Sequence, residues 1–298
     1  MKEEILKVSD GYELSLAIYE SKNPKGVFMI MHGMEEHKGR YDYVASELAK
    51  NGYNVVVSDM RGHGKNAPVQ GFFARKKGYQ RLIDDYVELS EHIKSLYNDL
   101  PLYVFAHSMG TITLRALLRT HSFDFKKAVL SGYPNYNGAI PVAIFLAKFI
   151  SIFKGKDGHS KMLDNLSTGS FNKKIKDPKT PVDWLSYNKE NVQEYINDPL
   201  SGIPFTISGY RDLFTLMKLM NKKGSYKGIN TCLPIYCISG EDDPCTGGEK
   251  GRNASIDKLR GQGFSMVQVK TYPKMRHEIL KEKEKDVVIS DIIKFIES

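Results

Sequence analysis

The chain contains few cysteines. Only Cys232, Cys237 and Cys245 occur among its 298 residues. An odd and sparse set does not form a disulfide framework, and none of the three pairs with a histidine at zinc-finger spacing. We therefore expect no bound metal and a reduced chain located in the cytoplasm.

Long apolar runs are also missing. The N-terminal segment MKEEILKVSDGYELS has no apolar core of the kind that a secretory signal needs. The most apolar stretch, residues 140–153, contains Pro141 and Lys148 and is too short to cross a bilayer. The sequence thus predicts neither a secretory signal nor a membrane-spanning helix.

The charge balance is basic but not concentrated. Lysine and arginine total 43 against 35 acidic residues, which gives a net charge of +8. The cations are scattered, without a run of five or six, so we interpret the excess as solvated surface and expect no nucleic-acid partner. Apolar residues make up 41% of the chain, which is enough for a substantial core.

Strand and helix patterns alternate along most of the chain. Alternating segments at 3–8 and 13–20 flank Asp10-Gly11 and predict a β-hairpin. Apolar runs predict further strands at 26–31, 54–59, 102–106, 127–132, 234–240 and 265–272. Helical periodicity predicts helices at 41–51, 79–98, from Met109 onward, near 249–261 and at 284–297. Such alternation predicts an α/β protein whose mostly parallel sheet is flanked by helices on both faces.

The alternation stops at residues 134–204. This segment holds helical pieces and polar loops but no convincing buried strand. It predicts a helical cap or lid inserted into a core formed by residues 1–133 and 205–298.

A serine follows one of the predicted strands. In Ala106-His107-Ser108-Met109-Gly110 it lies between a strand and a helix. A sharp strand-to-helix turn exposes a serine hydroxyl to a base and a substrate, and small residues on either side let strand and helix approach closely. Ser108 is therefore a candidate nucleophile, although an ordinary serine at a helix start would give a similar pattern.

A second loop follows the strand at 26–31. Its sequence is His32-Gly33-Met34-Glu35-Glu36-His37. In hydrolases built around such a serine turn, this loop supplies one backbone N–H of the oxyanion hole, and the residue after the nucleophile supplies the other. The two donors would be the backbone N–H groups of Met34 and Met109.

An acid and a histidine complete the pattern. Glu241, Asp242 and Asp243 follow the strand at 234–240; we favour Asp243, which precedes a proline, with Asp242 as the alternative. His277 follows the strand at 265–272 and would be the general base. The chain order of serine, acid and histidine, each just beyond a strand, is the order expected of the α/β-hydrolase fold.

Several strings together resemble a known family. HGMEEHKGRY (32–41), DMRGHG (59–64), AHSMG (106–110), SGEDDP (239–244) and RHEIL (276–280) are similar to the monoacylglycerol lipase and lysophospholipase group of α/β-hydrolases, also catalogued with serine aminopeptidases. The resemblance implies Ser108, Asp243 and His277 as catalytic triad, cleavage of a small-molecule acyl ester through an acyl-enzyme, and no cofactor. Ala106 and Thr111 depart from the glycines of that group without removing a catalytic group.

The apolar stretch at 140–153 has two interpretations. It could face an acyl chain, with Phe145, Phe149 and Ile150 as substrate-binding residues, or it could pack against the core. In the resembled family the cap can touch lipid surfaces, so a reversible peripheral membrane contact is a further expectation. The sequence indicates no oligomeric state.

Two other functions fit the same fold. An aminopeptidase or amidase would need acidic cap residues to hold a substrate ammonium, for which Glu190 and Glu194 are available. A non-catalytic binding protein would have no use for a complete triad.

Overall fold

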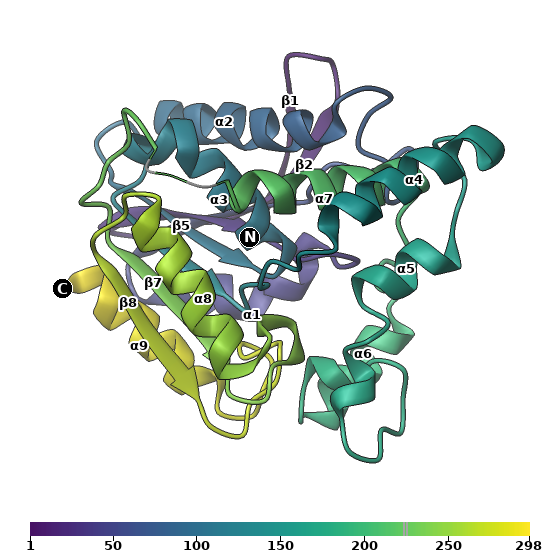
Figure 1. Cartoon of the computed structure of the whole chain (residues 1–298). Helices are drawn as coiled ribbons and strands as arrows, with labels where there is room; N and C mark the ends of the chain where they lie inside the picture. The colour runs from purple at the N-terminus through teal and green to yellow at the C-terminus, as the bar shows by residue number, and fades with distance from the viewer. Residues whose placement is uncertain (223, 225) are drawn as a thin grey trace.

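A computed structural model of the chain describes residues 1–222, 224 and 226–298 (Figure 1). Its strands form one eight-stranded sheet in the order β1-β2-β4-β3-β5-β6-β7-β8. The strands are β1 (Lys2–Lys7), β2 (Glu13–Tyr19), β3 (Gly26–Met31), β4 (Tyr53–Ser58), β5 (Leu102–His107), β6 (Lys127–Ser131), β7 (Ile235–Gly240) and β8 (Val267–Tyr272). The β1-β2 and β2-β4 pairs are antiparallel and the others are parallel, which confirms the predicted sheet class.

The central strands are apolar throughout because both faces of the sheet are covered. Successive side chains of a strand point to opposite faces. In β3, Met29 and Met31 join one buried cluster, whereas Phe28 and Ile30 join the other. Burial on both sides explains why GVFMIM carries no polar alternation.

Helices cover the two faces unequally. The helices are α1 (Asp42–Lys50), α2 (Gly78–Leu96), α3 (Met109–His121), α4 (Ile140–Lys154), α5 (Lys161–Ser167), α6 (Lys189–Asn197), α7 (Ile207–Met220), α8 (Gly248–Gly261) and α9 (Lys285–Glu297). The buried side chains of α2, α3, α7 and α8 form one cluster with the sheet. Those of α1 and α9 form the other.

The segment between β6 and β7 contains helices and no strand among its described residues. Within it α4 packs along α7, and α7 in turn packs on α2 and α3. Figure 1 shows α5 and α6 standing beside the sheet, and α5 also packs on α4 and α7. Nowhere in the described ranges is a helix both long and apolar enough to traverse a membrane.

Candidate active site

The candidate residues follow strands that run in the same direction. β3, β5, β6, β7 and β8 are successive parallel neighbours in the sheet. The carboxyl ends of parallel strands meet at one edge, where open α/β sheets bind ligands. Met34 follows β3, Ser108 follows β5, Asp243 follows β7 and His277 follows β8. The chain direction alone therefore gathers all four at this edge.

Ser108 occupies a strained turn between β5 and α3. Its φ is 50° and its ψ is −118°, a backbone conformation that residues other than glycine rarely adopt. The turn is held by the Ser108 N–H, which donates to the Ser131 carbonyl at 2.9 Å. A Cβ at Gly110 would clash with the Met31 carbonyl and lie 2.8 Å from the His32 carbonyl oxygen, so a larger residue would force the helix away from the end of β3.

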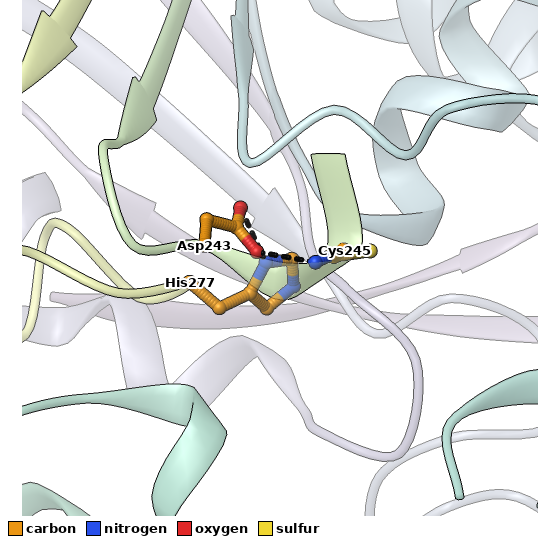
Figure 2. Close-up of side chains that lie close together, drawn as sticks. All are labelled: Asp243, Cys245 and His277. Atoms are coloured by element: carbon orange, nitrogen blue, oxygen red, sulfur yellow. Dashed lines mark hydrogen bonds and ion pairs between the residues drawn. The ribbon is translucent and has the colours of Figure 1, made fainter. Parts of the chain in front are cut away.

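Asp243 and His277 are directly paired (Figure 2). Nδ1 of His277 lies 3.0 Å from Oδ2 of Asp243, and both residues are buried. The other oxygen, Oδ1, accepts the backbone N–H of Cys245 at 2.8 Å. Asp242, the alternative acid, is exposed and instead accepts the hydroxyl of Tyr187 at 2.9 Å.

The Asp243 carboxylate governs the charge of His277. Burial by itself lowers the pKa of the imidazole, but the charge of Asp243 and its hydrogen bond outweigh burial and raise that pKa above its ordinary value. The neighbouring imidazole of His107, with its ring centroid 4.7 Å away, has the Ser131 hydroxyl at 3.3 Å from its Nδ1 in place of a carboxylate. Burial, with a smaller contribution from His277, lowers the pKa of His107 to about 4.

Ser108 and His277 line one cavity of about 1050 Å³. Within the described part of the chain, Nε2 of His277 is buried without a hydrogen-bond partner. The indole of Trp184 lies over the imidazole, with ring centroids 4.9 Å apart, and also lines the cavity. His277 thus presents its free nitrogen toward the cavity that Ser108 also lines.

The two expected oxyanion donors border the same cavity. Met109 is the first residue of α3, so its N–H has no carbonyl partner one turn earlier. Met34 follows Gly33, whose N–H donates to the Glu36 carboxylate. Glu36 also accepts the Tyr41 hydroxyl at 2.8 Å, and this fixes the loop that carries Met34.

A buried ionic network behind the site was not predicted from the sequence. Nη2 of Arg40 lies 2.8 Å from both carboxylate oxygens of Glu278, and Nε lies 3.2 Å from Oε2 of Glu36. The amide of Asn191, on α6, donates to Glu278 at 2.6 Å. The network thereby joins the loop after β3, helix α6 and the residue next to His277. The strings HGMEEHKGRY and RHEIL contain its three charged residues, but nothing in them indicates that these residues meet.

A second buried carboxylate connects the 186–188 segment to the loop of His277. Glu282 accepts the Arg276 N–H at 2.9 Å and the Ser186 hydroxyl at 2.8 Å. It also accepts the backbone N–H groups of Tyr187 and Asn188. The loop of His277 and the start of α6 therefore share one anchor.

The structure does not bring the predicted substrate-binding residues to the cavity wall. Phe145 and Phe149 are 65% and 51% exposed, and Ile150 packs against the core. The residues of α4 that line the cavity are Ile140, Val142, Ala143 and Leu146. Because α4 is apolar around most of its circumference, its residue pattern does not indicate which side faces the cavity.

Two acids in the cavity wall were also missed. Glu35, with a left-handed φ of 56°, and Asp164 of α5 both line the cavity. Burial, and then the charge of Asp164, raise the pKa of Glu35 to about 8. Glu190 and Glu194, which an amidase would need, are exposed and lie outside the cavity lining.

Comparisons with known proteins agree with this geometry. A monoacylglycerol lipase of Mycolicibacterium smegmatis is 26% identical over 93% of this chain and 89% of its own length. Phospholipase YtpA of Bacillus subtilis is 22% identical over 91% of this chain and 94% of its own length. The crystal structure of a thermostable carboxyl esterase from Bacillus coagulans, in complex with glycerol, has a TM-score of 0.91 at 28% identity, covering 99% of this chain and 97% of that chain.

The Hydrolase_4 family, described as serine aminopeptidase, S33, matches residues 22–284. This chain belongs to that family and is a serine hydrolase of the α/β-hydrolase fold.

Proposed function

We propose that this chain hydrolyses carboxylic esters of single-chain acyl groups, such as monoacylglycerols or lysophospholipids, with Ser108, His277 and Asp243 as its catalytic triad. The observation that carries the proposal is the Asp243–His277 pair at 3.0 Å, set beside a cavity that Ser108 also lines. The relatives described as lipases and a phospholipase support an acyl ester as substrate.

The proposed reaction has two halves, acylation of Ser108 and hydrolysis of the acyl-enzyme, and the same groups act in both. His277 Nε2 takes the proton of Ser108, and the serine oxygen attacks the ester carbonyl. The N–H groups of Met34 and Met109 stabilise the oxyanion, and the alcohol leaves with the proton from His277. Water then repeats the sequence on the acyl-enzyme. Asp243 keeps the ring oriented and stabilises its charged form throughout.

The cavity supports a substrate with one long apolar part. Its volume of about 1050 Å³ is at the upper end of typical small-molecule sites, which hold roughly 300–1,000 Å³. Side chains of α4 supply an apolar wall, and in this proposal residues 134–204 form the cap that encloses the acyl chain. All three cysteines are free thiols, which supports the cytoplasm as location.

The outer side of α4 supports a reversible contact with a lipid surface. Large apolar side chains lie exposed along it, namely Phe145, Phe149, Ile152 and Phe153. A helix that exposes such a row and belongs to a basic chain can lie against an anionic membrane. The substrate would then enter from the surface that the cap touches.

The test is hydrolysis of p-nitrophenyl esters from acetate to palmitate by wild type and Ser108→Ala. We expect wild type to turn over and the variant to lose activity by roughly 10⁴-fold or more. The chain length with the highest kcat/KM then measures the depth of the cavity. A folded wild type that cleaves none of these esters would overturn the proposal, and amide substrates would be tested next.

A further inference from the structure

Cys245 is a buried nucleophilic group for which the proposed reaction has no use. It lies two residues after Asp243, at the start of a short 3-10 turn formed by residues 244–246. Its side chain is buried, yet Cys245 and His277 both line the large cavity. Cys245 and His277 therefore border the same space.

Cys245, Asp243 and His277 bring three different kinds of ligand atom close together (Figure 2). A thiol sulfur, a carboxylate oxygen and a ring nitrogen lie within 4.8 Å of one another, and all three residues are buried. Zinc prefers this combination of sulfur, nitrogen and oxygen, and tetrahedral coordination at about 2.0–2.3 Å places ligand atoms roughly 3.5 Å apart. A small inward movement of the three side chains would bring them to that geometry.

We propose that Asp243, Cys245 and His277 form an inhibitory site for Zn²⁺ and similar thiophilic divalent cations, with water from the cavity as fourth ligand. The backbone N–H of Cys245 holds Oδ1 of Asp243, so Oδ2 is the oxygen that turns to the metal. Nδ1 of His277 is the nitrogen on the Asp243 side and becomes the ring ligand.

The proton balance explains why such binding stops the reaction. Metals bind cysteine as the thiolate, so the Cys245 thiol must give up its proton on binding. On binding, the thiol releases one proton to solvent, and the proton of Nδ1 moves to Nε2. Nε2 then carries a hydrogen and can no longer accept the proton of Ser108. The inhibition rests on the proposed hydrolase function, whereas the binding does not.

Cobalt(II) tests the binding directly, because a thiolate bound to Co²⁺ gives a charge-transfer band in the near ultraviolet. The chelator-treated full-length protein is titrated with Co²⁺ alone. We expect the band in wild type and in Ser108→Ala, its loss in Cys245→Ser, and its displacement by Zn²⁺. Cys232→Ser, which removes the exposed thiol, is the matched control and keeps the band.

Inhibition is measured with Zn²⁺ on the best p-nitrophenyl ester, each variant being normalised to its own rate without metal. We expect Cys245→Ser to raise the half-inhibitory concentration by at least about tenfold, because a hydroxyl replaces the soft sulfur ligand. Chelator should restore wild-type activity. Equal sensitivity of wild type and Cys245→Ser, or a wild type without the Co²⁺ band, overturns the site. The Ser108→Ala spectrum decides the binding even if no ester is cleaved.

Discussion

Arg40 places one guanidinium nitrogen, Nη2, 2.8 Å from both carboxylate oxygens of Glu278, the residue that follows His277. The same guanidinium also pairs with Glu36, and all three side chains are buried. Arg40→Met would leave two buried carboxylates without their cation. We expect it to lower the free energy of unfolding by about 3–5 kcal/mol, as measured by urea denaturation.

A surface pair provides the control for Arg40. Lys50 and Glu47 form an ion pair at 2.5 Å in which the lysine is largely exposed. Lys50→Met should change the free energy of unfolding by less than about 1 kcal/mol. If Arg40→Met cost no more than this control, the buried network would not be a source of stability.

The Asp243–His277 pair predicts the pH dependence of the reaction. In the proposed reaction His277 can act as a base only when it is neutral, and Asp243 raises its pKa above the ordinary value of about 6.5. Activity should therefore fall as pH drops through a value above 6.5. In Asp243→Asn the burial effect would be opposed only by the smaller contributions of Glu278 and Glu36. The acid limb of kcat/KM should therefore move to lower pH while kcat falls by about 10⁴-fold.

Asp242 is the matched control for this prediction. It is exposed, accepts a hydrogen bond from Tyr187 and forms none with His277 among the described residues. Asp242→Asn should leave the acid limb where wild type has it. A shifted limb in Asp242→Asn together with an unshifted one in Asp243→Asn would reverse the assignment of the acid.

Local patterns predicted most of the helices and strands, because each of these patterns depends only on residues that are close in sequence. GVFMIM coincides with β3, and the predicted hairpin, central strands and last helix agree with the structure to within about two residues. Strand order and the partners of buried charges depend on contacts distant in sequence. Arg40 and Glu278 are 238 positions apart, and no local pattern indicates that they meet. Helix α7 and the cavity side of α4 also depend on how the helices pack.

A substitution at Gly110 would test how closely α3 must approach the end of β3 and the loop that follows it. A Cβ there would meet the backbone carbonyls of Met31 and His32, which cannot move away as a side chain could. Gly110→Ala should destabilise the protein by about 1–3 kcal/mol and reduce activity, because the turn that carries Ser108 must shift. Thermal unfolding and ester hydrolysis measure the two effects.

Gly261, the last residue of α8, is the matching glycine in open space. A Cβ there meets nothing within 4 Å. Gly261→Ala should be neutral or stabilise by up to about 1 kcal/mol. Equal effects at the two positions would mean that the clash at Gly110 is relieved without cost.

The two sides of α4 make opposite predictions for chain length. Leu146 lines the cavity, so Leu146→Trp should fill part of it and move the optimum of the p-nitrophenyl series toward shorter acyl groups. Phe145, one position earlier, is 65% exposed, and Phe145→Ala should leave that optimum unchanged. With ester presented in anionic vesicles, Phe145→Ala should lower the hydrolysis rate, because it removes apolar surface available to the lipid. Its rate on dissolved esters should stay close to that of wild type. If Phe145→Ala instead moved the optimum for dissolved esters, the side chain would have to turn inward when substrate binds, and the cavity would include the side of α4 that now faces solvent.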